Sequence, residues 1–156
     1  MSVKLNAAAP AIKGVNQDNE PIALKDFKGQ WVVLYFYPKD NTSGCTQQAC
    51  EFRDAMSGLA KKGVSIIGVS PDSVKSHQKF IANHQLNFNL IADEDKSICT
   101  KYGVWVEKSM YGRKYMGVER TTFIINPDGK IAQIYPKVKV PGHVAEVQEW
   151  LKENAK

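Results

Sequence analysis

The sequence predicts an α/β fold in which helices flank a central mixed sheet. Apolar, β-rich segments alternate with segments of helical periodicity from residue 31 to residue 103. Pro127-Asp128-Gly129 is a strong turn signal between two further apolar segments, which predicts a β-hairpin. The chain then closes with an amphipathic helical pattern after Pro141. Alternating elements are typical of a parallel sheet, to which the hairpin would add antiparallel strands.

The first strands are predicted from short apolar runs. Two patches, at residues 11–12 and 21–24, flank the polar segment 16–19 and predict an N-terminal β-hairpin. Residues 31–37 (WVVLYFY) form an unbroken apolar run before Pro38. Such a run predicts a strand buried on both faces.

A long helix is expected next. Ala49, Phe52, Met56 and Leu59 recur at helical spacing, and one turn back along that face lies Cys45. We therefore expect Cys45 in the first turn, facing inwards. Free N–H groups and the helix dipole favour negative charge there, so the position suits a nucleophilic thiolate. The hydroxyls of residues 42–43 could cap this helix or bind a species at the sulfur.

The remaining elements follow in order. Residues 64–70 and 86–92 are predicted strands, separated by a helix that residues 71–73 cap. A short helix around Cys99 follows. Residues 104–118, rich in aromatics and methionines, are predicted to be a long loop packed on the core, with a substrate pocket or a subunit contact as the alternatives. Strands at 121–126 and 130–135 and a final helix with Trp150 on its core face complete the chain.

Composition limits the class of function. The chain has 156 residues, 43% hydrophobic and 24% charged, which fits a single globular domain over residues 1–156. No run reaches the length of a membrane span and no secretory signal is apparent, so we expect a cytoplasmic protein with no membrane partner. The net charge is +5, but the lysines are scattered, so nucleic-acid binding is not expected.

Three cysteines argue for reactive chemistry or burial rather than a disulfide framework. In a continuous helix the alpha carbons of Cys45 and Cys50 would lie about 8–9 Å apart, more than the roughly 7 Å that a disulfide allows. Bonding the pair would therefore require the helix to unwind. Cys99 is expected to be a small buried residue, with a resolving thiol as the alternative.

A zinc module built from the three cysteines and one of His77, His84 and His143 is a competing hypothesis, although its spacing matches no common pattern. Taken singly, each histidine is expected at the surface or in a helix cap.

Pro38, Thr42 and Cys45 match the PxxxTxxC signature of the peroxiredoxins. The segment YPKDNTSGCTQQACEFRD resembles the Q-type subfamily, also called bacterioferritin comigratory proteins. The resemblance continues at residues 9–10, 68–70, 102–104 and 120–123, and so extends over nearly the whole chain.

This resemblance implies a thioredoxin-like fold with an N-terminal β-hairpin extension and a thiol-dependent peroxidase that acts on hydrogen peroxide and organic hydroperoxides. It assigns the attacking thiolate to Cys45. Peroxide binding falls to Thr42, Arg120 and the backbone near Gly44, while Pro38 shields the thiolate. Fixed donors of this kind stabilise the charge that develops on the leaving oxygen.

The sulfenic acid formed at Cys45 is predicted to condense with Cys50 as an intramolecular disulfide. The resemblance implies thioredoxin, or a glutaredoxin, as the reductant and suggests a monomer, with no metal or cofactor. One alternative is a redox-sensing or disulfide-exchange protein in which the Cys45–Cys50 switch controls partner binding. A thioredoxin-type oxidoreductase would instead require C-x-x-C.

Two residues depart from the family pattern. Ser43 stands where proline is common, which bears on the rigidity of the loop. Gln48 stands where glutamate is frequent, so one negative charge is absent from the start of the helix. The loss of that charge should favour the thiolate by only about 0.3–1 kcal/mol.

Overall fold

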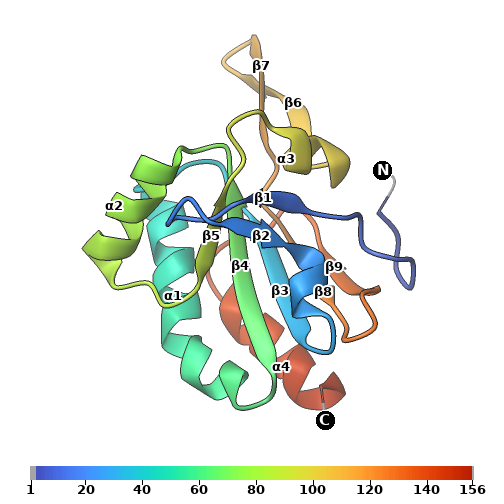
Figure 1. The fold of residues 1–156 in the computed structure, drawn as a ribbon. Coiled ribbons are helices and arrows are strands. Elements are labelled where there is room, and N and C mark those ends of the chain that lie inside the picture. The colour runs from blue at the N-terminus through green and yellow to red at the C-terminus, as the bar shows by residue number, and fades with distance from the viewer. Residues whose placement is uncertain (1–2, 156) are drawn as a thin grey trace.

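A five-stranded mixed sheet forms the centre of the molecule. The computed structural model describes residues 3–155, and its strands follow the order β5-β4-β3-β8-β9. The central strand β3 pairs in parallel with β4 and antiparallel with β8 (Figure 1). The bounds are β3 (Trp31–Phe36), β4 (Val64–Ser70), β5 (Asn89–Ala92), β8 (Thr121–Ile125) and β9 (Ile131–Tyr135).

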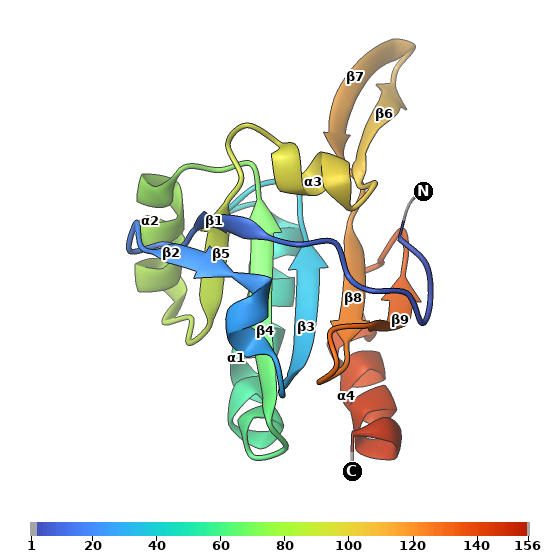
Figure 2. The same cartoon turned by 45° about the vertical axis from the view of Figure 1, so that its right-hand side comes forward.

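Helices cover one face of this sheet. Val33, Tyr35 and Tyr37 alternate along the chain and pack against α1 (Ser43–Ala60), α2 (Val74–His84) and α4 (His143–Asn154). The opposite face carries the N-terminal hairpin and α3. The hairpin crosses in front of the sheet in Figure 2. These elements are β1 (Lys13–Val15), β2 (Pro21–Ala23), the 3-10 helix η1 (Leu24–Phe27) and α3 (Ser97–Lys101).

The predicted α/β class is confirmed, as are the N-terminal hairpin, the long helix and the antiparallel pair β8–β9. Boundaries differ slightly. The first central strand ends one residue early, at Phe36, and β5 begins at Asn89 rather than at residue 86. Residues before Asn89 are still buried at Leu86 and Phe88, so their apolar character reflects core packing outside the strand.

The expectation of a long loop at residues 104–118 is wrong. β6 (Trp105–Met110) and β7 (Arg113–Val118) form an antiparallel hairpin in regular register. Tyr111 and Gly112 both have positive φ (52° and 79°), as a tight two-residue hairpin turn requires. The hairpin projects from the body of the molecule (Figures 1 and 2), and Tyr111 is 99% exposed, so its tip does not pack on the core.

Within residues 3–155, none of the helices is both long enough and apolar enough to cross a membrane.

Candidate active site around Cys45

Cys45 lies in the first turn of α1, where the chain has just left the central strand. Thr42 is the N-cap residue, with extended backbone angles (φ −86°, ψ 156°), and its carbonyl accepts a hydrogen bond from the N–H of Thr46 at 2.8 Å. The Cys45 side chain faces inwards and is 1% exposed. The unpaired N–H groups and the dipole of this helix end favour negative charge. The predicted position of Cys45 is therefore confirmed, and it suits a thiolate.

Arg120 supplies a positive charge at the sulfur. It lies immediately before β8, and its backbone carbonyl accepts a hydrogen bond from the N–H of Val138 at 2.8 Å. One guanidinium nitrogen, Nη2, donates to Cys45 Sγ at 3.1 Å. A cation held this close stabilises the thiolate through a charge-assisted hydrogen bond.

Gln48 orients the same guanidinium from the other side. Its Oε1 accepts a hydrogen bond from Arg120 Nη1 at 2.6 Å, and the side chain is completely buried. Its Nε2 has no hydrogen-bond partner in the described structure. The sequence identified Gln48 only as a missing charge. Its spacing of three residues from Cys45 on one helix face was the signal that could have placed it in the site.

Thr42, Gly44 and Pro38 are the other residues that the sequence predicts for the site of Cys45 and Arg120. Thr42 Oγ1 donates to the carbonyl of Lys39 at 2.9 Å and makes no side-chain cap, so of the two roles expected for this hydroxyl, capping is not the one it takes. A β-carbon on Gly44 would lie 3.5 Å from Arg120 Nη2, so the Gly44 backbone passes close to the guanidinium. Pro38 is half-buried at the exit of the strand.

Cys50 lies in the continuous part of the same helix. It is half-buried and not bonded to another cysteine. Arg53 Nη1 lies 3.7 Å from Cys50 Sγ and donates to the backbone carbonyl of His84 at 2.7 Å. The two cysteines thus belong to one uninterrupted helix, and a bond between them would require that helix to open.

Comparison with known proteins gives the family. A sequence model of the protein family described as AhpC/TSA matches residues 5–134 of this chain. The chain belongs to the AhpC/TSA family. Among its relatives, the putative peroxiredoxin Bcp of Coxiella burnetii is 50% identical over 94% of this chain and 97% of its own length. Peroxiredoxin Bcp of Escherichia coli K12 is 44% identical over 98% of both chains.

Solved structures agree with this assignment. Peroxiredoxin Q of Xanthomonas campestris is 41% identical, with a TM-score of 0.89 over 93% of this chain and 92% of its own. A cysteine-to-serine variant of peroxiredoxin Q of Xylella fastidiosa is 36% identical, with a TM-score of 0.95 over 100% of this chain and 99% of its own. The predicted resemblance to Q-type peroxiredoxins and the thioredoxin-like fold are confirmed.

Cys99 of this peroxiredoxin lies on the opposite face of the sheet from Cys45. It is completely buried in the apolar cluster on the face of the sheet that carries the N-terminal hairpin and α3, and this cluster also contains Ile98 and Tyr102. Burial, and then the nearby carboxylate of Asp93, raise the pKa of the Cys99 thiol. The sheet also prevents Cys99 and Cys45 from sharing one metal ion, which removes the zinc hypothesis built on all three cysteines.

Tyr35 of β3 and Tyr37, just after this strand, are buried in the same apolar cluster as Cys45. The Tyr35 hydroxyl is buried and has no hydrogen-bond partner in the described structure. Its pKa is raised well above the usual value, mainly by burial and then by the negative charges of Cys45 and Asp40. Tyr37 donates its hydroxyl proton to Asp40 Oδ1 at 2.6 Å. The site is therefore a low-dielectric environment in which one fixed charge strongly affects another.

The expectation that each histidine lies at the surface or in a cap is wrong for two of the three. His77 is 0% exposed and His143 is 3% exposed. His143 Nε2 lies 2.9 Å from Thr122 Oγ1, and its Nδ1 lies 3.3 Å from Glu146 Oε1. Burial lowers the pKa of His143, although Glu146 opposes this effect. Each buried ring is accommodated by partners from other parts of the chain.

Proposed function

We propose that this peroxiredoxin reduces hydrogen peroxide and organic hydroperoxides with Cys45 as the attacking thiolate. The observation that supports this most strongly is the 3.1 Å hydrogen bond from Arg120 Nη2 to Cys45 Sγ at the start of a helix. The cation and the helix end act on the same sulfur, and both favour its charged form.

The first step transfers one oxygen atom. The Cys45 thiolate attacks the terminal oxygen of the peroxide, the S–O bond forms, and the O–O bond breaks. The remaining oxygen leaves as water or an alcohol after it takes up a proton, and the sulfur becomes a sulfenic acid. Arg120 and the backbone near Gly44 are the donors for the peroxide oxygens, while Pro38 shields the sulfur. The Thr42 hydroxyl, whose proton is donated to the Lys39 carbonyl, can accept a hydrogen bond from the peroxide O–H.

The second step joins Cys45 to Cys50. The Cys50 thiolate attacks the sulfenic sulfur, the S–S bond forms, the S–O bond breaks, and the hydroxide leaves as water after it takes up a proton. Because the two cysteines belong to one continuous helix, the first turns of α1 must unwind. Arg53 supports Cys50 as the nucleophile, since its guanidinium lies 3.7 Å from the sulfur and can stabilise negative charge there.

A dithiol protein then restores both thiols by disulfide exchange, and we infer thioredoxin, or a glutaredoxin, in the cytoplasm for this role. We also infer a monomer, since both reacting thiols belong to one helix. The relatives support the choice of substrate. The bacterioferritin comigratory protein of Xanthomonas campestris, 40% identical with a TM-score of 0.89 over 93% of this chain and 92% of its own, has structures of intermediates and ligand complexes in alkyl peroxide reduction.

Peptide mapping by mass spectrometry after one equivalent of peroxide tests both steps. We expect a Cys45–Cys50 disulfide in the native protein and a sulfenic acid at Cys45 in Cys50→Ser. A Cys45–Cys99 bond would contradict the second step only. Unreacted Cys45 in both proteins would contradict the peroxidase mechanism itself.

A further inference from the structure

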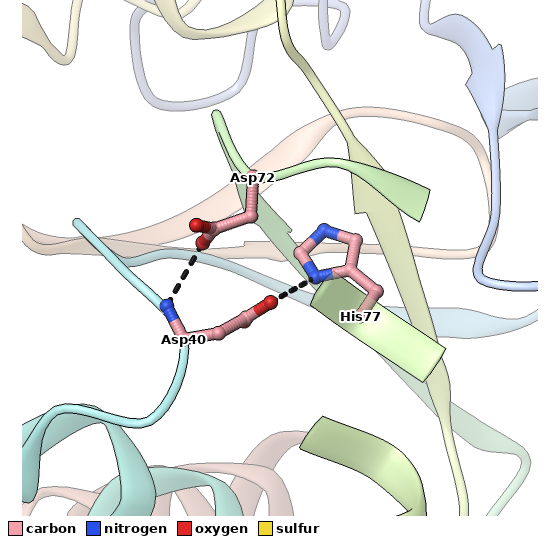
Figure 3. Close-up of side chains that lie close together, drawn as sticks. All are labelled: Asp40, Asp72 and His77. Atoms are coloured by element: carbon pink, nitrogen blue, oxygen red, sulfur yellow. Dashed lines mark hydrogen bonds and ion pairs between the residues drawn. The ribbon is translucent and has the colours of Figure 1, made fainter. Parts of the chain in front are cut away.

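A buried carboxylate fixes the chain just upstream of the reactive helix. Asp40 is 5% exposed, and both of its oxygens are engaged. Oδ1 accepts from the Tyr37 hydroxyl at 2.6 Å, and Oδ2 accepts from Ser76 Oγ at 2.8 Å. Oδ2 also lies 2.7 Å from Nδ1 of His77, and a dashed line marks this contact in Figure 3. A carboxylate in an apolar core requires partners of this kind.

His77 is held equally firmly on its other side. Its Nε2 lies 2.9 Å from the backbone carbonyl oxygen of Ile91 in β5. A carbonyl oxygen can only accept, so Nε2 carries a hydrogen. One further proton is then shared between Nδ1 of His77 and Oδ2 of Asp40. The pair has no net charge whichever of the two atoms holds that proton.

The backbone of Asp40 is fixed as well. Its N–H donates to Asp72 Oδ2 at 2.8 Å, and that oxygen also accepts from Ser70 Oγ at 2.6 Å (Figure 3 shows the first of these bonds). Asp40, Asp72 and His77 lie close enough together to be considered as metal ligands. However, their facing atoms are already engaged in short hydrogen bonds, which account for the arrangement without an ion.

Asp40, which connects these contacts, lies two residues before Thr42 in the chain. Asn41, between them, has a left-handed backbone (φ 62°), and the Thr42 hydroxyl donates to the carbonyl of Lys39, the residue before Asp40. Only Asn41 separates Asp40 from Thr42, and the Thr42–Lys39 hydrogen bond closes the turn around both of these residues. Any shift of Asp40 must therefore move the Thr42 hydroxyl and the first-turn N–H groups of α1.

We propose that the buried Asp40–His77 pair positions the peroxide-binding loop, by fixing Thr42 and the start of α1 against β4, α2 and β5. The pair also compensates the charge of the buried Asp40 carboxylate, since Nδ1 of His77 lies 2.7 Å from Asp40 Oδ2. Asp40 and His77 are positioning residues and do not touch the peroxide. This inference rests on the proposed function, because it assumes that Cys45 and Thr42 meet the substrate.

The test compares two reagents in the Cys50→Ser background, which isolates the first step. Hydrogen peroxide requires the aligned donors, whereas iodoacetamide requires only a thiolate that it can reach. We expect His77→Gln to lower the rate constant with peroxide by roughly ten- to a hundredfold, as a small misplacement of a catalytic group does. The rate constant with iodoacetamide should not fall in parallel.

Ser73→Ala is the matched control. Ser73 Oγ caps the same helix by accepting from the N–H of Ser76 at 3.1 Å, so this variant weakens the start of α2 and leaves the Asp40–His77 contact in place. It should leave the ratio of the two rate constants unchanged. Asp40→Asn, which keeps the shape and can still donate to Nδ1 of His77, should lose less of the peroxide rate than Asp40→Ala.

Two results would overturn the proposal. One is an unchanged ratio of rate constants in His77→Gln. The other is an equal change in Ser73→Ala, which would mean that stability of α2 alone is responsible. If His77→Gln does not fold, equal peroxide rates in Asp40→Asn, Asp40→Ala and the parent protein would also contradict it. A parent protein whose Cys45 does not react with peroxide would instead refute the proposed function.

Discussion

Replacement of Arg120 by methionine tests the electrostatic basis of the site. Methionine has a similar length but carries no charge, so the variant removes the 3.1 Å hydrogen bond to Cys45 Sγ and the 2.6 Å bond to Gln48 Oε1. A hydrogen bond to a charged group contributes about 1.5–3 kcal/mol net. At about 1.36 kcal/mol for each factor of ten, the rate constant for oxidation of Cys45 should fall roughly 10- to 150-fold.

The assay is a single-turnover reaction with hydrogen peroxide in the Cys50→Ser background, in which the remaining thiol is alkylated and counted by mass spectrometry. Arg113→Met is the control, because Arg113 is exposed at the turn of the projecting hairpin. It removes an arginine without altering the site. A rate constant for Arg120→Met within twofold of the parent, or an equal loss in Arg113→Met, would refute the reasoning.

Three other buried side chains give further tests. Gln48→Glu places a carboxylate beside Arg120 that competes with the Cys45 thiolate for the guanidinium. The ultraviolet absorbance of the thiolate at neutral pH should therefore fall. The rate constant with peroxide should also fall, by about fivefold if the thiolate loses about 1 kcal/mol of stabilisation. Cys99→Ala should leave peroxide turnover unchanged and lower the free energy of unfolding by about 1 kcal/mol, measured by urea denaturation. His143→Gln should make stability less sensitive to acid. The folded state lowers the pKa of His143 from 6.5, so the contribution of the neutral ring to stability is lost as pH falls below that value. Melting temperatures measured above and below pH 6.5 would report this loss.

Each of these tests has a contrary outcome. A Gln48→Glu variant that reacts faster with peroxide would show that firmer orientation of the guanidinium outweighs charge competition. Loss of peroxide turnover in a folded Cys99→Ala variant would support the alternative role of Cys99 as a resolving thiol. Parallel acid profiles for the native protein and His143→Gln would mean that other groups cause the loss of stability at low pH.

Local patterns predicted the elements that build the scaffold. The apolar run of residues 31–37 and the helical spacing of Ala49, Phe52 and Leu59 are properties of neighbouring residues, and burial in the core enforces both of them. Extrapolation of the same spacing placed Cys45 correctly in the first turn, facing inwards. Periodicity thus predicted the position of the sulfur without any knowledge of its partners.

Long-range partners could not be predicted in this way. Arg120 is 75 residues from Cys45, and Asp40 is 37 residues from His77. Family resemblance identified Arg120, since no local pattern distinguishes it from other basic residues. For His77 the sequence predicts a place at the surface or in a helix cap, because an isolated polar residue is usually exposed. Its burial depends on a carboxylate and a carbonyl that the fold brings together from other elements.

The projecting hairpin was missed for a different reason. Aromatic residues and methionines usually indicate packing, so residues 104–118 were expected to cover the core. Tyr111-Gly112 forms the turn of this hairpin, with positive φ at both positions. The many aromatic residues and methionines around it favoured the interpretation as a packed loop, so the turn was not predicted. Two strands pair on either side of this turn, and the backbone groups that face the partner strand form hydrogen bonds across the hairpin, apart from the main sheet.

The exposure of this hairpin determines what oxidation of its methionines does to the enzyme. Met110 and Met116 are 55% and 49% exposed, on a protein whose substrate oxidises thioethers to sulfoxides. A sulfoxide in a core adds a polar oxygen where nothing can solvate it, but on these two side chains the new oxygen faces water. Damage at these positions therefore leaves the packing around Cys45 intact, and the molecule can accumulate oxidised methionine there without losing its fold.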